Sequence, residues 1–319
     1  MHLPERFDAD VISAFGRHLL ARDDAGQTCR ARPFGRQLDI VCGDRVRCER
    51  DAHGEVLVVE VLPRRTSLLR SNARGASEPI VANLDLLAIV IAAVPQPDLF
   101  MVDRYLSAAA SCSLSALLVI NKADLSLDDA DLAGLAELAT LGYGIHRVGA
   151  RAGTGLEDLA TALAGHTSAL VGQSGVGKSS LIRRLAIDGQ DAVTGELMRE
   201  SEGRHTTTAS RLYDCIGGGR IIDSPGVRDY APSVDQLEPT TLGFLEVQQH
   251  AGECRFQDCR HLQEPQCGVR AAVERGAISA RRYESYRRLR RLFDQLMASR
   301  NPHGRKGAGG KPPRSGPAR

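Results

Sequence analysis

The chain has 319 residues, of which 42% are hydrophobic and 25% are charged, and its formal net charge is +2 at pH 7. One nucleotide-binding domain does not fill this length, which allows two or three folded domains. The apolar run at residues 86–94 is far shorter than the ~20 residues that span a bilayer, and the N-terminus lacks a signal-like apolar core. We therefore expect no membrane-spanning helix, no secretion signal and no membrane partner.

The first 75 residues have the patterning of β-strands and contain no convincing helix. Strands are expected at 38–42, 44–48 and 55–61, separated by turns at Gly43 and at 51–54. A compact all-β unit of this size is typical of an OB-type barrel, which often carries RNA contacts. A basic linker follows, which either contacts phosphate or is simply solvated. Its arginines are Arg64, Arg65, Arg70 and Arg74.

A guanine-reading motif follows two apolar strands. Residues 86–94 and 116–120 have the continuous apolar character of parallel strands buried on both faces. The second strand ends at Asn121-Lys-Ala-Asp, where open α/β sheets bind ligands. The Asp124 carboxylate can accept from guanine N1–H and the 2-amino group, a donor pair that adenine lacks. Asn121 would approach N7, and the stem of Lys122 would lie over the base. The alternative is an ordinary surface turn.

A second base contact is expected at residues 148–151, Val-Gly-Ala-Arg, which match the loop that is commonly Ser-Ala-Lys. Gly149 departs from that pattern. The backbone N–H of Ala150 can still reach guanine O6, so the departure changes little.

Residues 172–179 form a phosphate-binding loop that fits G-x-x-x-x-G-K-[ST] without a mismatch. An apolar strand at 167–171 precedes it and a helical pattern at 180–186 follows it, as the motif requires. Lys178 would reach the β- and γ-phosphates as a catalytic residue, and the Ser179 hydroxyl would ligate Mg²⁺. The loop alone does not choose between ATP and GTP. The nucleotide-contacting residues expected here are Gly172, Gln173, Ser174, Gly175, Val176, Gly177, Lys178, Ser179 and Ser180.

Two further segments have the character of GTPase switches. In the polar segment 203–208, Thr207 is the favoured Mg²⁺ ligand and Thr206 is close behind, although an ordinary polar loop is the alternative. In Asp223-Ser-Pro-Gly226, the aspartate would hold Mg²⁺ through water and the Gly226 N–H would contact the γ-phosphate. These assignments complete a GTP site.

The water-orienting residue of many GTPases is missing. Val227 stands where a glutamine is often found, and its side chain cannot form hydrogen bonds. Turnover is therefore very slow, or another group positions the water. We hypothesise that His205 is this group, with packing or RNA binding as its alternative role.

The order of these motifs is rotated. The base reader and base loop come before the phosphate loop and both switches, as in circularly permuted GTPases. In the chain, this order puts the base reader next to the OB-like domain and the second switch next to the C-terminal region.

A cysteine-rich cluster at residues 254–267 has the pattern Cys-x₄-Cys-x-His-x₅-Cys. Three thiolates and an imidazole suit a closed, structural Zn²⁺ site. A disulfide would leave one of these cysteines unpaired and has no secretion signal to support it. The expected zinc ligands are Cys254, Cys259, His261 and Cys267.

The C-terminal end concentrates positive charge. Residues 281–319 hold 12 Lys/Arg and 2 Asp/Glu, and the chain beyond Asn301 has the composition of a disordered arm. Before it, an apolar helical stripe is expected to dock on the zinc module, with arginines on the other faces. Contact with nucleic-acid phosphate is favoured over a solvated helix. The stripe is Tyr286, Leu289, Phe293 and Leu296.

Taken together, these residues resemble the ribosome small-subunit-dependent GTPase A family, RsgA, over nearly the whole chain. The stretches that carry the resemblance are 81–85, 103–106, 203–208, 223–226 and 254–267. The resemblance implies a GTPase that binds the 30S subunit and its 16S rRNA late in maturation, is stimulated by it, and helps to release assembly factors.

The sequence therefore predicts a cytoplasmic, monomeric, multidomain α/β protein that uses GTP/GDP, Mg²⁺ and one structural Zn²⁺. We expect an OB-type β-barrel at 1–75, a circularly permuted P-loop GTPase domain at 76–231, a helical zinc-binding domain at 232–300 and a basic tail at 301–319. Three alternatives remain open: GTP as a mainly structural ligand, ATP in place of GTP, and action on another ribosomal particle.

Overall fold

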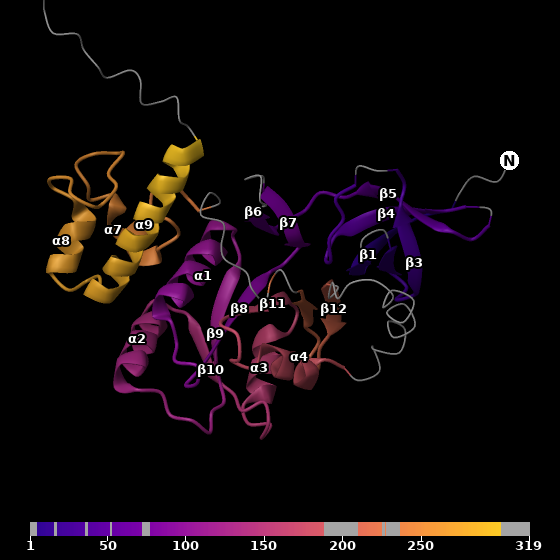
Figure 1. Cartoon of the computed structure of the whole chain (residues 1–319), viewed down its shortest axis with the longest axis horizontal. Helices are drawn as coiled ribbons and strands as arrows, with labels where there is room; N and C mark the ends of the chain where they lie inside the picture. Colours follow the sequence, from indigo (N-terminus) through magenta and orange to yellow (C-terminus); the bar gives the residue numbers. More distant parts are fainter. Residues whose placement is uncertain are drawn as a thin grey trace, which may run out of the picture.

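The computed structural model has three regions: an N-terminal barrel, an α/β core and a Cys-rich helical region (Figure 1). These three regions confirm the expected fold class. The structure describes residues 5–15, 18–35, 38–51, 53–71, 77–187, 210–224, 227 and 237–300.

The barrel has five strands and its own hydrophobic core. Strand β1 pairs with both β2 and β4, and this double pairing closes the ring. Alternate residues such as Ala9, Val11 and Val46 point inward and are fully buried, as the period of a strand requires. The strands are β1 Glu5–Phe15, β2 His18–Asp23, β3 Thr28–Pro33, β4 Arg45–Arg50 and β5 Val56–Val61.

The strand expected at 38–42 is not formed, and that prediction is wrong. Only Cys42 makes an isolated bridge, to Val81. The chain turns here because the buried Asp44 carboxylate accepts from the Val41 N–H at 2.8 Å and pairs with Arg64 at 2.6 Å. A local side-chain bond thus replaces a strand ladder.

The α/β core is a sheet with strand order β10-β9-β8-β11-β13-β12. The first five strands are parallel, and β12 is antiparallel to β13. Their bounds are β8 Leu86–Ala92, β9 Ser115–Asn121, β10 Gly144–Arg147, β11 Thr167–Val171, β12 Ser210–Asp214 and β13 Arg220–Asp223. A separate hairpin, β6 Ser67–Ser71 and β7 Ser77–Ala82, joins the barrel to the core.

Helices cover both faces of this sheet. Every side chain of β8 is buried, as expected of a strand between two layers. Its odd-numbered residues pack with α1 and α2, and its even-numbered residues pack with α3 and α4. Asp98 starts α1 by accepting from the N–H groups of Phe100 and Met101. The helices are α1 Leu99–Ser111, α2 Asp129–Thr140, α3 Leu156–Leu163 and α4 Lys178–Leu185.

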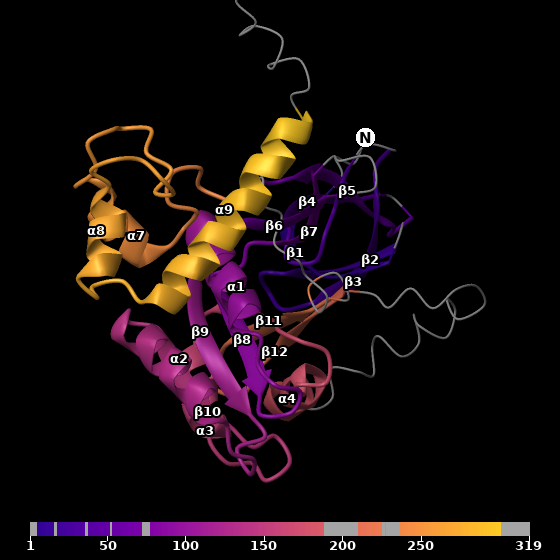
Figure 2. The same ribbon diagram turned by 60° about the vertical axis from the view of Figure 1, so that its left-hand side comes forward.

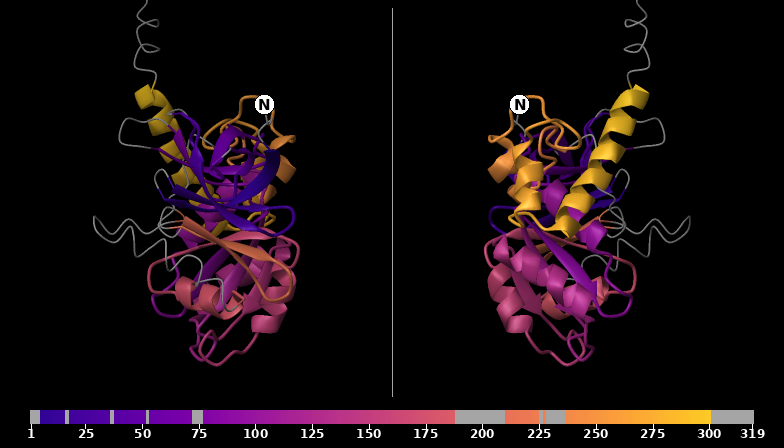
Figure 3. Two further views of the ribbon diagram at one scale, coloured as in Figure 1. Left: turned by 90° about the vertical axis from the view of Figure 1, so that its right-hand side faces the viewer. Right: turned by 90° about the vertical axis from the view of Figure 1, so that its left-hand side faces the viewer.

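The barrel adjoins the edge of the sheet at β12, since β1 and β12 pair directly. Figure 3 shows the barrel above this edge. The base-reading strand β9 follows the barrel in the chain, but in space it lies four strands away from β12. The barrel is therefore next to the strands that flank the switches, which the linear order of the motifs did not reveal.

The Cys-rich region packs on the α1 side of the core through α9, which crosses over α1 (Figure 2). Tyr286, Leu289 and Phe293 are buried as expected, and they belong to the same hydrophobic core as α1 and α2. The prediction for Leu296 is wrong, because its side chain is 42% exposed. The helices are α7 Leu245–Ala251, α8 Gly268–Glu274 and α9 Ala280–Arg300. Among the residues described, no helix combines the length and apolarity needed to cross a membrane.

Candidate nucleotide site and metal centre

The predicted nucleotide-contacting residues that the structure describes gather at one edge of the sheet. Strands β8, β9, β11 and β13 are parallel, so their carboxyl ends meet there. Asn121 ends β9, the phosphate loop follows β11, and Asp223 ends β13.

The phosphate loop has a backbone that only glycine accommodates at two positions. A Cβ at Gly172 would lie 2.1 Å from the Val90 carbonyl oxygen, and one at Gly177 would lie 2.3 Å from Asn121 Nδ2. Both glycines have positive φ angles, 136° and 98°. Gly177 is the N-cap of α4, so the loop presents the N-terminus of this helix, where backbone N–H groups favour phosphate.

Lys178 is buried at the start of α4, and its ammonium bridges the loop. Its Nζ donates to the carbonyl oxygens of Gly172 at 2.7 Å and Gln173 at 2.8 Å. The positive charge of Lys178 is thus held inside the phosphate loop.

Asn121 ties the phosphate loop to the base loop. Its side-chain Nδ2 donates to the Val176 carbonyl at 2.8 Å, and its Oδ1 accepts from the Ala150 N–H at 3.2 Å. The Asn121 side chain is only 2% exposed, so both bonds are shielded from water. The structure brings these three predicted residues together although they are far apart in the chain.

In the base-reading turn, Lys122 is half-buried and Asp124 is exposed to solvent. Lys122 has a φ of 58°, and its Nζ donates to the Val94 carbonyl at 2.6 Å. Asp124 is exposed in the turn that follows. A Cβ at Gly149 would lie 2.6 Å from Thr154 Oγ1, which explains why glycine stands where serine is common. Ser174 and Gly175 are also exposed, while Ser179 and Ser180 are half-buried.

Four predicted residues lie outside the described part of the chain: His205, Thr206, Thr207 and Gly226. Asp223 is half-buried at the end of β13, opposite Arg211 of β12. Val227 is 1% exposed and packs in the core shared by α1 and α9, so its role is packing.

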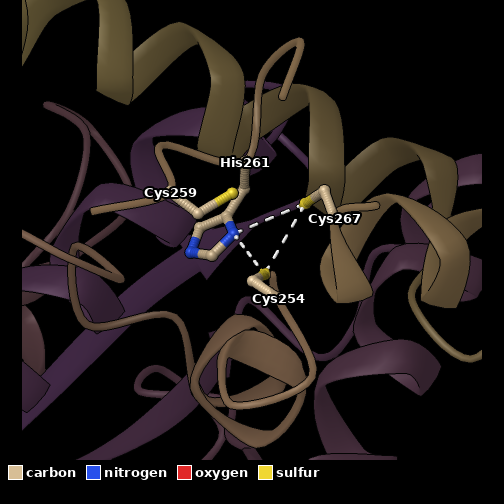
Figure 4. Close-up of side chains that lie close together, drawn as sticks. All are labelled: Cys254, Cys259, His261 and Cys267. Carbon is tan, nitrogen blue, oxygen red and sulfur yellow. Dashed lines mark hydrogen bonds between the residues drawn. The ribbon is translucent and has the colours of Figure 1, made fainter. Parts of the chain in front are cut away.

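The four predicted zinc ligands converge in one cluster (Figure 4). Their four ligand atoms all lie within 4.8 Å of one another. The Cys254 Sγ is 3.9 Å from the Cys267 Sγ and 3.4 Å from His261 Nδ1. A tetrahedral zinc ion with ~2.3 Å bonds to sulfur holds its sulfurs about 3.8 Å apart. The donor set therefore fits Zn²⁺ in both chemistry and spacing.

The surroundings of the cluster suit a metal centre. Burial lowers the pKa of His261, which keeps the imidazole neutral and able to ligate. Burial also raises the pKa of Cys259 to about 12, so this thiol needs a cation to ionise. Within the described residues, His261 Nε2 is buried without a hydrogen-bond partner. The N–H of Gly268 donates to the Cys254 sulfur at 3.3 Å.

Helix α9 holds the cluster in place through Tyr286, which belongs to the predicted apolar stripe, and Tyr283, which does not. The Tyr283 hydroxyl donates to the His261 carbonyl at 2.7 Å, and the Tyr286 hydroxyl donates to the Arg260 carbonyl at 3.0 Å. Tyr286 also meets the Phe244 ring edge-on at 5.6 Å. Only the apolar helical spacing indicated that this helix would dock here.

A buried ion-pair network fastens this region to the core. Arg282 pairs with Asp103 of α1 and with Glu246 of α7, each at 2.6 Å. Arg281 also pairs with Asp103, at 2.9 Å, and with Glu137 of α2 at 2.8 Å. In the sequence, Asp103 stands out only as part of the stretch 103–106. In the structure, it pairs with both arginines and so joins α9 to α1.

The GTPase motifs lie in a segment that resembles a known protein family. A family model described as RsgA GTPase matches residues 61–232. The chain belongs to the RsgA GTPase family. As a member of that family it is a GTPase, with a guanine nucleotide as its substrate.

Individual relatives of the RsgA GTPase family match most of the chain. The small ribosomal subunit biogenesis GTPase RsgA of Azotobacter vinelandii is 43% identical over 288 residues, which are 88% of this chain and 83% of the relative. The protein of the same name from Pseudomonas aeruginosa is 39% identical over 284 residues, with the same two coverages.

Solved structures agree with the RsgA assignment. The crystal structure of YjeQ from Thermotoga maritima has a TM-score of 0.71 and 31% identity, and covers 92% of this chain and 99% of its own. YloQ, described as a circularly permuted GTPase, has the same TM-score at 23% identity, covering 92% and 96%. The rotated motif order is thus the circular permutation of this fold.

Proposed function

We propose that this GTPase acts in the biogenesis of the small ribosomal subunit by binding the 30S particle and its 16S rRNA and hydrolysing GTP there. The observation that carries the proposal is one chain with a barrel, a permuted GTP site and a zinc-type cluster, at 43% identity to a small-subunit biogenesis GTPase. We propose that it works as a cytoplasmic monomer.

The proposed substrate contacts follow from the site. Asp124 accepts from the guanine edge, and Asn121 holds both loops in register. The Ala150 N–H, which donates to Asn121 Oδ1 at 3.2 Å, would be shared between that oxygen and guanine O6. Lys178 lies in the loop that would surround the β- and γ-phosphates, and charge stabilisation there is the main catalytic term for phosphoryl transfer.

The proposed magnesium ligands are oxygen donors, of which Ser179 and Asp223 lie at this edge of the sheet and Thr207 lies outside the described residues. Ser179 and Thr207 would ligate Mg²⁺ directly, Asp223 would act through water, and the Gly226 N–H would contact the γ-phosphate. When bound, Mg²⁺ neutralises charge that develops on the phosphate oxygens. Oxygen is the donor type that Mg²⁺ prefers, so the residues fit the ion.

The proposed zinc ion would be structural. Cys254, Cys259, His261 and Cys267 supply four protein ligands, which leaves no open position for a reacting water. We propose that this ion fixes the loop on which α9 rests.

Turnover is proposed to depend on the ribosomal particle. Val227 is buried in the core, so its side chain cannot orient a water molecule. The same observation supports the second candidate function, in which GTP serves mainly as a structural ligand of an RNA-binding assembly factor.

Two measurements test the proposal. Co-sedimentation with separated 30S and 50S subunits across a salt series should give binding to 30S that weakens as salt rises. Single-turnover hydrolysis of GTP should be faster with 30S than without it. Preferential binding to 50S would overturn the choice of particle. A hydrolysis rate unchanged by 30S would favour the structural-ligand alternative.

A further inference from the structure

The barrel and the GTPase core are joined by backbone pairing, in addition to the linker. Strand β1 pairs with β4 through residues 5–10 and then with β12 through Ser13 and Ala14. A bulge lies between Val11 and Ser13, where the register against β2 shifts. Bulges bend a strand and redirect its side chains, so β1 can leave the barrel wall and extend the core sheet.

Two buried serines, Ser13 and Ser224, and the half-buried Ser210 line up across this β1–β12 seam. The Ser13 hydroxyl, 0% exposed, donates to the Ser210 carbonyl at 2.9 Å. The Ser210 hydroxyl donates to Ser224 Oγ at 2.8 Å, and Ser224 is only 2% exposed. Buried hydroxyls are restricted to the partners that the fold provides, so this path is a defined feature of the native state.

Ser210 lies beside the first segment predicted to be a switch, and Ser224 lies within the second. Ser210 begins β12, two residues beyond Thr208 of the first-switch segment 203–208. Ser224 directly follows Asp223 and precedes Gly226 by two residues. These bonds thus connect the barrel with Ser210, which closely follows the segment assigned to Mg²⁺, and with Ser224, which lies in the segment whose Gly226 is assigned to the γ-phosphate.

Ion pairs fix the register of the seam. Arg22 of β2 binds Asp214 of β12 with two hydrogen bonds, one of them at 2.9 Å. Arg220 of β13 pairs with Asp10 of β1 at 3.0 Å. The hydrogen bond from Arg22 to Asp214 raises the pKa of the guanidinium further, so the pair stays charged. Because these two ion pairs fix β12 and β13 against the barrel strands, the serines cannot exchange partners by a shift in strand register.

We propose that Ser13, Ser210 and Ser224 are positioning residues for GTP hydrolysis, through which the barrel fixes the ends of β12 and β13 that adjoin the two switch segments. This inference rests on the proposed assignment of those segments. A partner bound to the barrel would then change the hydrolysis rate through β1, and by linkage the nucleotide would change the partner's affinity for the barrel.

Kinetic measurements on the full-length chain test this path of hydrogen bonds from Ser13 through Ser210 to Ser224, which we call the relay. Ser13→Ala lies on the barrel and removes one hydrogen bond, so we expect kcat to fall about fivefold, the factor matching one net hydrogen bond. The dissociation constant for GTP should stay within about twofold, because Ser13 is not among the proposed nucleotide contacts. An unchanged kcat, or an equal loss in GTP affinity alone, would overturn the proposal.

A double-mutant cycle separates the relay from ordinary destabilisation. Ser224→Ala should also slow hydrolysis, and Ser13→Ala combined with Ser224→Ala should be no slower than the slower single variant. Fully multiplicative losses would mean that the two serines act independently. As matched arginine variants, Arg22→Gln at the seam should lower kcat, whereas Arg47→Gln, which pairs with Asp8 and Glu60 inside the barrel, should not.

Hydrogen exchange on the unmodified protein gives a readout that needs no variant. Amides of β1 that face β12 should exchange more slowly with a non-hydrolysable GTP analogue than with GDP, while the β1–β4 amides stay unchanged. Equal exchange in both states would overturn the relay even if the protein hydrolyses GTP. If the unmodified chain neither binds nor hydrolyses GTP, the proposed function fails first and the relay falls with it.

Discussion

The Arg282 guanidinium donates to the Asp103 carboxylate at 2.6 Å across the boundary between the Cys-rich region and the core. The two side chains are 3% and 1% exposed, so neither charge is hydrated. Desolvation by itself lowers the pKa of Arg282, but Asp103 and Glu246 outweigh it and the pKa is raised. A buried charge pair of this kind disfavours other orientations, because separating the two side chains would leave buried charge without its full set of partners.

Arg282→Met should lower the free energy of unfolding by about 3–5 kcal/mol, because it leaves the buried Glu246 carboxylate without its cation and leaves Asp103 with Arg281 alone. Urea denaturation with near- and far-UV circular dichroism measures this loss. Arg291→Met changes the same charge on an exposed face of α9 and should stay within about 0.5 kcal/mol of wild type. Similar losses in both variants would show that the network does not fasten the region.

Zinc binding should release at least two protons, from the Cys259 and Cys267 thiols of the cluster. Burial raises the pKa of Cys259 to about 12 and that of Cys267 above its ordinary value, so these thiols are protonated without an ion. His261 contributes no proton because burial lowers its pKa. Calorimetric titration of zinc into chelator-treated protein, in two buffers of different ionisation enthalpy, gives the number. Cys112→Ser, outside the cluster, should leave it unchanged.

Glu264 should stabilise the loop between His261 and Cys267. Burial raises its pKa, but the N–H groups of Arg260, Leu262 and Gln263 outweigh this and lower the pKa to about 2. The stabilisation is therefore present above the unfolded pKa near 4.5 and is lost as pH falls toward 2.

Comparison of Glu264→Gln with wild type isolates this carboxyl, since both proteins carry the same zinc ligands. We expect a loss of about 1 kcal/mol at pH 7 that stays constant down to pH 5 and shrinks below it. Glu274→Gln, exposed on α8, is the control for the charge change. A difference that grows as the pH falls below 5 would contradict the assignment.

Substitutions of Asp124 and of Asn121 should have different effects, the first on base preference and the second on stability. Asp124→Asn should lower GTP affinity by at least about 10²-fold and raise that for xanthosine triphosphate, because the amide pairs with the xanthine edge. Stability should not change, since Asp124 is exposed. Asp129→Asn, an exposed neighbour on α2, should change neither property. Nucleotide competition binding with both triphosphates measures the preference.

Asn121→Ala should instead lower stability by about 1–3 kcal/mol per unpaired group, since the Val176 carbonyl and the Ala150 N–H lose their buried partner. GTP affinity should fall without a switch in base preference. Thermal unfolding of the nucleotide-free chain distinguishes this variant from Asp124→Asn. A variant as stable as wild type would show that the link between the loops carries no free energy.

Local motifs were the part of the molecule that the sequence predicted well. A strand–loop–helix signature and an apolar strand are properties of short segments, so β11, α4 and β9 were located from their own residues. The cluster at Cys254 to Cys267 was found for the same reason.

Long-range pairings could not be read from the sequence. Nothing near Ser13 indicates Ser210, 197 residues away, and nothing near Asp103 indicates Arg282. The segment 38–42 has the residue pattern of a strand, yet its Val41 N–H donates to the Asp44 carboxylate instead of to a neighbouring strand. The two long-range pairings depend on which edges and faces meet in space, about which local pattern carries no information, whereas the outcome at 38–42 depends on a local side-chain bond.

His205 is the remaining candidate for positioning the attacking water, because Val227 packs in the core. His205→Ala should lower the single-turnover rate by about 10²-fold, the smaller end of what a positioned acid–base group contributes. GTP affinity should be unchanged, since histidine acts only on the reacting water. The measurement needs both free protein and protein with 30S subunits, because a partner that supplied its own catalytic group would mask the loss. His53→Ala, on the exposed surface of the barrel, is the matched control. Wild-type rates in both conditions would remove His205 from the mechanism and leave the partner as the source of the group.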